Sequence, residues 1–458
     1  MFQFYLHIRI LDFLKNISAL KIIQMKKFIL FLTFLSCNIA FCQYTLIPDA
    51  GFEQKLISLG FDADNTINGQ VLTSDISGIT EISLNAGLPL MSNIIGIQDF
   101  VGLTKFSISY GDNLDAINLQ GNTNLKELLI LFNTPNGVLT SPSLNLSNNL
   151  QLEILRLGFA TNLNLDITNN INLHELEYTN SFLSSLNVSN NINLKHLDLY
   201  NDNINWSLNL SNNLALEYLD LSVNRFQYLD LSTNVNLKYL FLGSNEFQDL
   251  TLENNTLLEH LDVQHNNFTT LDVTANTQLR SINCAENNIN YFSLNNNSNL
   301  MFLYANNNNL TNLTIQNGNN SSLSGSVLFY GNLTNKFSVL NNPNLRCIFV
   351  DDVNYCNTNW LGKDTTSNYV SNTAECNLLN TNENIVASKF KLYPNPASDI
   401  IHIEADLNVD NIAIYNMFGQ LVLETTKKDI NVSQLNSGTY IAKIFTEDKM
   451  EIVKFVKN

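Results

Sequence analysis

Positive charge is scarce in this chain of 458 residues. Lysine and arginine together number 24, against 41 aspartate and glutamate residues, and the formal net charge is −17. A field of this sign repels phosphate backbones, so the composition argues against a nucleic-acid-binding protein. No nucleic-acid partner is therefore expected.

Histidine is also rare, and none of its occurrences belongs to a known catalytic motif. The histidines are His7, His174, His196, His260, His265 and His402. No nucleophile elbow, zinc-protease helix or phosphate-binding loop surrounds any of them. We therefore expect no enzymatic activity, no metal site and no cofactor.

Cysteine is scarce enough to be interpreted position by position. Cys284 stands where leucine or valine stands in neighbouring copies of the repeat described below, which predicts a small buried hydrophobic residue. Cys347, Cys356 and Cys376 lie close together in the sequence, and export would permit one disulfide among them with one thiol left over. The pairing stays open. A zinc site is the alternative, but this segment has no histidine ligand.

The apolar run near the N-terminus is short. It covers residues 28–36, which is too short for a comfortable membrane span. Two lysines after Met25 precede the run and the small-residue segment 40–43 follows it, which is the order of a secretory signal peptide. We therefore expect Met25 to be the true start and residues 1–42 to hold an upstream extension and the signal, although the extension could instead lengthen the signal. A lipoprotein anchored at Cys37 is an alternative, but the residues before it depart from the usual lipobox.

Leucine, in contrast, is abundant and recurs with a period of 21 or 22 residues. Copies of the pattern L-x-x-L-x-L/V-x-x-N open at Leu152, Leu173, Leu194, Leu216, Leu237, Leu258, Leu279 and Leu300. A unit of this size cannot bury its own apolar side, so the copies must stack as a solenoid. Segments such as LEYLDLSVN at 216–224 resemble the leucine-rich repeat. That resemblance implies that the first half of each copy is a strand of a parallel sheet on the concave wall of an arc.

The second half of each copy is patterned as well. In FQYLDLSTN at 226–234, Phe226, Leu229 and Leu231 all need the interior, so we expect short extended segments and turns rather than a helix. Two columns of asparagine follow the same period, with Asn224, Asn245, Asn266, Asn287 and Asn308 closing the first half and Asn234, Asn255, Asn276 and Asn297 closing the second. Backbone groups that turn inward need partners, so we interpret both columns as structural.

The repeat fades toward both ends of the array. Weaker copies begin at Ile79, Leu103 and Leu125, and an insertion at Thr134-Pro135-Asn136-Gly137 should form a loop. Pro48 to Phe61 has the apolar spacing of a helix, as expected for a capping segment. The sequence thus predicts an N-terminal cap at 43–78, a repeat array at 79–350, a C-terminal cap at 351–376, a linker at 377–389 and a last domain at 390–458.

The last domain has a different pattern. Short alternating runs separated by turn residues predict a small antiparallel β-sandwich. Its motifs are Tyr393-Pro394-Asn395-Pro396, Ile414-Tyr415-Asn416 with Gly419, Ser437-Gly438-Thr439-Tyr440 and Lys454-Phe455-Val456-Lys457-Asn458. They resemble the type A sorting domain of the type IX secretion system. That resemblance implies a Bacteroidetes bacterium, export through the inner and outer membranes, and the type IX secretion machinery as a partner; such a domain is usually removed after export. The alternative is a further binding module.

Two columns of side chains should face outward from the predicted sheet, because side chains alternate across a strand. The third and fifth positions of the repeats carry His196, Tyr218, Tyr239, Phe241, His260, Phe302 and Tyr304. Exposed aromatics beside carboxylates are typical of a protein- or carbohydrate-binding site, although aromatics also simply suit strands. His196 and His260 should lie about 14 Å apart, too far for shared metal coordination.

Aspartates share the fifth position with these aromatics. They are Asp198, Asp220 and Asp262, and Phe241 interrupts their column. We interpret them as solvated strand carboxylates rather than as calcium ligands.

The combined expectation is a mainly β protein, with a leucine-rich-repeat solenoid and a small antiparallel sandwich. It is exported, non-catalytic, and binds a protein or glycan through its concave sheet. One alternative is a secreted hydrolase with its site before Leu152 or near Pro135, where carboxylates at Asp49, Glu53, Asp62, Asp64 and Asp75 have no matching nucleophile and base. A structural surface-coat component without a discrete ligand is the other.

Overall fold

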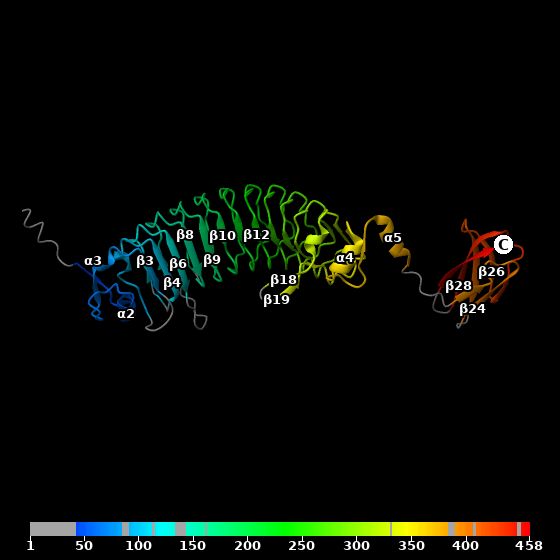
Figure 1. Cartoon of the computed structure of the whole chain (residues 1–458), viewed down its shortest axis with the longest axis horizontal. Coiled ribbons are helices and arrows are strands. Elements are labelled where there is room, and N and C mark those ends of the chain that lie inside the picture. The colour runs from blue at the N-terminus through cyan, green and yellow to red at the C-terminus, as the bar shows by residue number, and fades with distance from the viewer. Residues whose placement is uncertain are drawn as a thin grey trace, which may run out of the picture. The chain divides into compact units, whose positions relative to one another are not determined.

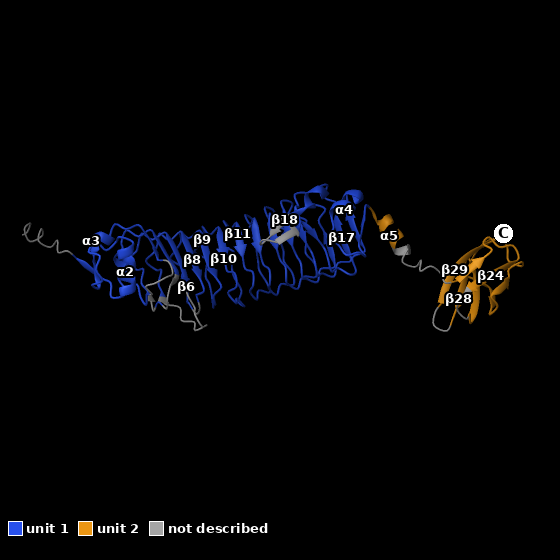
Figure 2. Cartoon of the chain, turned by 60° about the horizontal axis from the view of Figure 1, so that its bottom comes forward, with its two compact units in different colours: residues 1–371 blue, residues 372–458 orange. Residues whose placement is uncertain are grey.

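A computed structural model describes most of the chain from residue 43 onward. The described ranges are 43–84, 91–111, 114, 116–132, 143–160, 163–329, 332–382, 390–405, 409–446 and 450–458. The predicted signal peptide and the predicted loop at 134–137 lie outside them. The chain divides into two compact units, residues 1–371 and 372–458 (Figure 2). No helix in the described ranges is long and apolar enough to cross a membrane.

Unit 1 is a solenoid whose coils stack side by side along an arc (Figure 1). Its main sheet has twelve parallel strands in chain order. They are β3 (Glu81–Leu84), β4 (Lys105–Gly111), β6 (Glu127–Phe132), β8 (Ile154–Gly158), β9 (Glu175–Thr179), β10 (His196–Asp198), β11 (Tyr218–Asp220), β12 (Tyr239–Phe241), β13 (His260–Asp262), β14 (Ser281–Asn283), β16 (Phe302–Tyr304) and β20 (Phe337–Ser338).

The leucines of neighbouring coils stack in one interior column. Leu240 lies opposite Leu219 on one side and Leu261 on the other, and all three are buried. Since side chains alternate along a strand, burying this central residue turns the residues before and after it outward. The predicted continuous parallel sheet is therefore confirmed.

The second halves of the coils contain short extended segments and turns, as predicted. In the late coils they form a second parallel sheet of β15 (Tyr291–Ser293), β17 (Asn312–Ile315), β21 (Cys347–Val350) and β22 (Asn368–Val370), and in the early coils β5 (Ala116–Ile117) pairs with β7 (Ser143–Leu144). Phe226, Phe247 and Phe268 stack inside, with ring centroids 6.4 and 6.3 Å apart.

Both asparagine columns bond backbone groups within and between coils. Asn245 donates from Nδ2 to the carbonyl oxygens of Leu221 (2.9 Å) and Leu242 (3.1 Å), while its Oδ1 accepts the N–H of Phe226 (2.9 Å). In the second column, Asn255 Nδ2 donates to carbonyl oxygens of the preceding coil. This column starts earlier than the sequence pattern suggests, with Asn122, Asn149, Asn170, Asn191 and Asn213.

Short helices and strands cover the solenoid at both ends. At the N-terminal end these are β1 (Tyr44–Leu46), α2 (Ala50–Ser58), β2 (Gln70–Leu72), α3 (Thr73–Ile76) and η1 (Ile97–Asp99), with the helix α2 inside the segment where one is predicted. At the other end they are η3 (Asn320–Leu323) and α4 (Val353–Asn359), while β18 (Ser326–Phe329) and β19 (Asn332–Asn335) form a separate two-stranded sheet. Trp360 closes the interior there by stacking on Phe337, with centroids 4.5 Å apart.

The cysteines agree with the sequence, which predicts a buried Cys284 and one disulfide with one thiol left over among the other three. Cys284 is a fully buried free thiol inside its coil. Cys347 and Cys376 are disulfide-bonded, and Cys356 is a buried free thiol.

The described residues of unit 2 form one helix and two antiparallel sheets. The helix α5 (Thr373–Asn382) covers the last residues of the predicted C-terminal cap and the first part of the predicted linker. One sheet is β23 (Phe390–Tyr393), β24 (Ile400–Ala405) and β27 (Asp429–Asn431); the other is β26 (Leu421–Thr425), β25 (Asn411–Asn416), β28 (Gly438–Phe445) and β29 (Met450–Lys457). Ile401, Ile412 and Phe455 belong to one core shared by the two sheets, as in the predicted sandwich.

Candidate functional site on the sheet face

Four adjacent strands bring most of the predicted site residues together. The register of β10 to β13 places His196 opposite Tyr218, Tyr218 opposite Tyr239, and Tyr239 opposite His260. Phe241 is on the same outward side, two residues after Tyr239. We call the outward side of the twelve-stranded sheet the sheet face, and these five residues the ring stack.

The rings contact one another from coil to coil. His196 stacks on Tyr218 with centroids 4.0 Å apart and planes within 4°, and Tyr239 stacks on His260 at 5.0 Å and 6°. Between these two pairs, Tyr218 lies 6.1 Å from Tyr239 and 5.5 Å from Phe241, with tilted planes. The fixed spacing of the coils therefore assembles one continuous aromatic surface.

Phe302 and Tyr304 do not join this surface. Both are on β16, and β14 inserts the small polar residues Ser281 and Asn283 between them and β13. Lys336 Nζ lies 5.7 Å from the Phe302 ring centroid, and Tyr304 Oη donates to the carbonyl of Asn335 (2.7 Å). Phe302 and Tyr304 are therefore separate from the ring stack.

The interpretation of the neighbouring aspartates as solvated is wrong. Asp198, Asp220 and Asp262 are only partly exposed between the rings and the turn after each strand. Burial raises the pKa of Asp198 to about 7 and that of Asp262 to about 6, and it also raises the pKa of Asp220. Loss of water around a carboxylate disfavours its charged form and so raises its pKa.

The two histidines of the ring stack are neutral ring partners. Burial lowers the pKa of both His196 and His260, which disfavours their charged form. His196 Nε2 is 3.8 Å from Glu177 Oε1, too long for a hydrogen bond. Arg156 instead pairs with Glu177 (3.2 Å) and with Glu175.

A buried carboxylate that the sequence pattern did not single out follows β10. Asp202 stands in the first asparagine column, one coil before Asn224, and is fully buried. Its Oδ1 accepts the N–H of Ser181 (2.9 Å), while Oδ2 finds no hydrogen-bond partner among the described residues. Burial raises its pKa to about 8, with a smaller contribution from Asp198. Counting the column through every coil would have revealed this aspartate.

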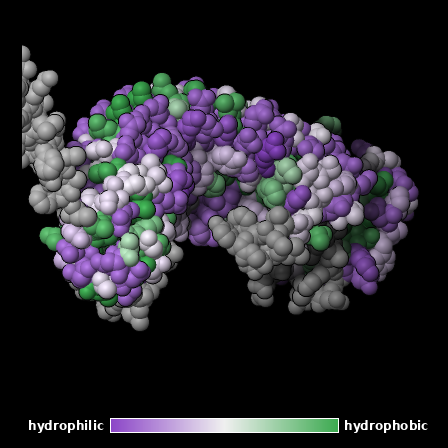
Figure 3. Space-filling view, turned by 60° about the vertical axis from the view of Figure 1, so that its left-hand side comes forward, coloured by the Kyte–Doolittle hydropathy of each residue, from purple (hydrophilic) through white to green (hydrophobic). Residues whose placement is uncertain are grey.

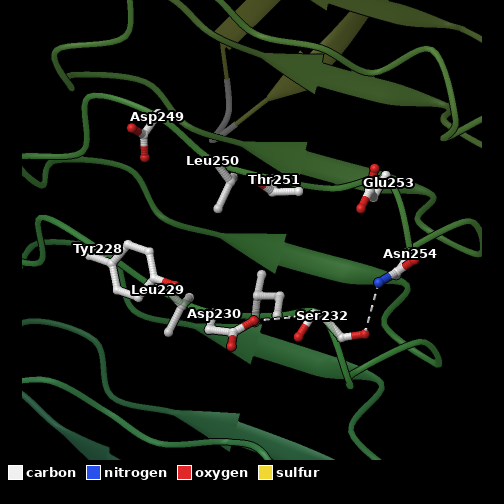
Figure 4. Close-up of a pocket in the computed structure, with 10 residues that line it drawn as sticks. Tyr228, Leu229, Asp230, Ser232, Asp249, Leu250, Thr251, Glu253 and Asn254 are labelled. Carbon is white, nitrogen blue, oxygen red and sulfur yellow. Dashed lines mark hydrogen bonds between the residues drawn. The ribbon is translucent and has the colours of Figure 1, made fainter.

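The second halves of the coils offer a different kind of surface. Figure 4 shows an open depression between two neighbouring coils, with Tyr228, Asp230, Asp249 and Glu253 around it. The pKa of Asp230 is lowered by hydrogen bonds from Ser232, as for a solvated turn carboxylate. None of the predicted site residues lines this depression.

Two carboxylates of the N-terminal region accept hydrogen bonds from backbone groups, while a third, Asp62, is buried and its pKa is raised by that burial. Asp49 Oδ1 accepts the N–H of Phe52 (2.8 Å) at the start of α2, and its Oδ2 accepts from Ser92. Glu53 Oε1 accepts the N–H groups of residues 68, 69 and 70. Across the described residues, no group of three or more histidine, cysteine, aspartate or glutamate side chains is arranged to hold a metal ion.

Exposed aliphatic residues form a stripe away from the sheet face. They lie two residues before an opening leucine and are Leu150, Ile171, Ile192, Leu214 and Val235. Figure 3 shows a largely hydrophilic surface over the coils, with hydrophobic residues gathered along the upper edge in that view. The pattern that predicts the sheet face does not predict this stripe.

Comparison with known structures identifies the fold of the solenoid. The functional domain of InlJ from Listeria monocytogenes, which includes a cysteine ladder, is 18% identical with a TM-score of 0.51, and the match covers 91% of this chain and 99% of that one. An internalin (inlF) from Listeria monocytogenes is 22% identical with a TM-score of 0.49, covering 71% of this chain and 95% of that one. No curated protein matches the chain.

Comparison with known families identifies unit 2. Residues 391–458 match the secretion system C-terminal sorting domain, which includes both antiparallel sheets except for the first residue of β23. This agrees with the motifs that resemble the type IX sorting domain. The chain therefore carries a leucine-rich-repeat solenoid with a type IX sorting domain, and its destination is the cell surface or the extracellular space.

Proposed function

We propose that this exported protein binds a protein or carbohydrate ligand on its sheet face and carries out no catalysis. The observation that supports it best is the ring stack, in which aromatic and imidazole rings from four successive coils form one surface. A few residues, often Trp, Tyr or Arg, supply most of the binding energy at protein interfaces. A leucine-rich-repeat solenoid provides the rigid support that such a surface needs.

Tyr239 supports this proposal over a purely structural role for the rings. Its side chain is among the exposed large hydrophobics at 37%, although the neighbouring rings are partly covered. A ring that only stabilised the coils would gain more by being covered. We infer that the surface is kept open for a ligand, with Phe302 and Tyr304 as a second contact region two strands further along.

The arrangement of acid and base groups argues for a non-catalytic protein. His196 and His260 are three strand steps apart, and both are neutral because of burial. Of the five carboxylates that the hydrolase alternative would use, Asp49 and Glu53 are held by backbone N–H groups. A general base must have an oxygen or nitrogen within hydrogen-bond reach of its substrate. The carboxylate oxygens of Asp49 and Glu53 are already hydrogen-bonded to the backbone.

An array experiment tests the proposal. The full chain is applied to arrays of extracellular proteins and glycans beside the variant Tyr218→Ser/Tyr239→Ser/Phe241→Ser. The control Tyr228→Ser/Tyr291→Ser removes exposed rings of the second halves, which are 66% and 53% exposed. We expect ligands that the wild type and the control bind and the triple variant does not. If all three chains bind the same ligands, the site lies elsewhere; if the wild type binds none, a surface-coat role is favoured.

A further inference from the structure

Two carboxylates beside the ring stack have no cation to neutralise them. Asp198 and Asp220 lie directly opposite each other on β10 and β11. Among the described residues neither forms an ion pair, because the nearby basic side chains pair elsewhere. Arg156 pairs with Glu175 and Glu177, and Lys238 pairs with Glu217.

The orientation of these carboxylates leaves an oxygen for a ligand. Asp198 Oδ1 accepts the N–H of Tyr200 (2.9 Å), and Asp220 Oδ1 accepts the N–H of Ser222 (2.8 Å). These hydrogen bonds fix both carboxylates at the turns after their strands. Asp198 Oδ2 forms no hydrogen bond with the described residues, whereas the Ser222 side chain also donates to the Asp220 carboxylate.

Stacking covers part of the ring faces beside these carboxylates. His196 and Tyr218 are parallel and in contact, and so are Tyr239 and His260, so each pair covers one face of both of its members. A sugar that binds by stacking needs an open ring face, whereas ring edges and carboxylates can surround a cationic side chain. The carboxylates without an ion-pair partner among the described residues therefore favour a cationic protein ligand over a neutral glycan.

We propose that the ligand is a protein that places an arginine side chain, or less favourably a lysine, between Asp198 and Asp220 against the edge of the ring stack. This inference rests on the proposed binding function of the sheet face. Neighbouring strands are about 4.8 Å apart, so one planar guanidinium can donate to both carboxylates. Arginine suits this arrangement because its donors form a rigid fork, while lysine offers a compact point charge.

The electrostatic surroundings of Asp198 support a cationic ligand. Glu177 on β9 and Asp220 on β11 face it from the two neighbouring strands, and Asp202 follows it on its own coil. Burial raises the pKa of Asp198 first, and the charge of Asp220 adds to it. A bound guanidinium would reverse both effects by replacing lost water and opposing the like charge.

A peptide array with paired charges tests the inference. Each peptide is printed twice, once with arginine and once with citrulline, which has a similar shape but no charge. The array is probed with the full-length wild type, with Asp198→Asn/Asp220→Asn, and with the control Asp230→Asn/Asp249→Asn. The control removes the same two charges from exposed positions in the second halves of the coils.

We expect the wild type to prefer arginine peptides over their citrulline partners. The Asp198→Asn/Asp220→Asn variant should bind them at least about tenfold more weakly, since truncating a partly buried charge pair weakens binding strongly. The control should change binding by less than about twofold, because exposed charges act weakly. Equal binding of arginine and citrulline peptides by the wild type, or an equal loss in both variants, would overturn the inference.

The same array separates this inference from the proposed function. The variant Tyr218→Ser/Tyr239→Ser/Phe241→Ser is probed alongside. If it loses binding while charge has no effect, the sheet face binds a ligand but not through a cation. If it keeps the full arginine preference, the arginine does not lie against the ring stack, which overturns that part of the inference and removes the main support for the proposed function.

Discussion

Replacing Asp202 with asparagine should stabilise the solenoid at neutral and alkaline pH. One coil later in the same column, Asn224 accepts backbone N–H groups with Oδ1 and donates from Nδ2 to the carbonyl oxygens of Leu199 (2.7 Å) and Leu221 (3.0 Å). Asp202 keeps the first role, because its Oδ1 accepts the N–H of Ser181. Asp202 Oδ2 takes the place that Nδ2 has in Asn224. When the carboxylate is ionised, this oxygen has no hydrogen to donate. Only the protonated acid can reproduce the bonding of the column.

The size of this effect follows from proton linkage. An aspartate in the unfolded chain titrates near pH 3.9, and burial raises the pKa of Asp202 in the folded chain to about 8. Between these values the folded chain binds a proton that the unfolded chain has lost, so the free energy of unfolding falls as pH rises. The slope is about 1.4 kcal/mol per pH unit for one group. The loss is complete above the folded pKa.

Urea unfolding followed by circular dichroism measures this slope. From pH 5 to pH 8 the advantage of Asp202→Asn over the wild type should grow by about 4 kcal/mol, which is three units of that slope. The reverse change, Asn224→Asp, places a carboxylate in the next coil and should create a new loss of stability with rising pH. An Asp202→Asn variant with the same pH dependence as the wild type would refute the reasoning.

Three further predictions concern the core, the second asparagine column and the sorting domain. Leu240→Asp should abolish cooperative thermal unfolding, because an unpaired buried charge costs several kcal/mol, whereas Leu240→Met should not; equal melting curves would contradict the stacked interior. Asn255→Ala should lower the urea-unfolding free energy by about 2 kcal/mol by removing bonds to Leu231 and Asn234, and the exposed control Asn254→Ala should lose less. Deleting residues 391–458 should leave the solenoid folded but in the periplasm, as cell fractionation and circular dichroism would show, and surface display of the deletion would disprove the export role.

The fold could be predicted because every copy of the repeat has apolar residues at the same positions. Leu219, Leu240 and Leu261 recur at a fixed interval, and only stacking can bury all of them. The extended second halves were predictable for the same reason, since their apolar residues leave no helical face. The early members of the second asparagine column, such as Asn149, were harder to find because the apolar pattern around them is weaker.

The candidate site could be predicted only in part. Alternation along a strand correctly turns Tyr218 and Tyr239 outward, because that depends on backbone geometry alone. The partial burial of Asp198 depends on the neighbouring rings and turns, which a strand pattern does not describe. The separation of Phe302 from the ring stack depends on Ser281, a small residue that interrupts the column of rings.

The central claim is that the ring stack binds a ligand rather than stabilising the coils. The most direct test measures, for the wild type and for Tyr218→Ser/Tyr239→Ser/Phe241→Ser, both the Kd of one ligand selected on the arrays and the melting temperature. Surface substitutions usually change stability by about half a kcal/mol or less, whereas a lost aromatic anchor weakens binding by about 2 kcal/mol or more. We predict a loss of at least about thirtyfold in affinity with a nearly unchanged melting temperature. Unchanged affinity in a folded variant, or a large fall in melting temperature, would contradict the account.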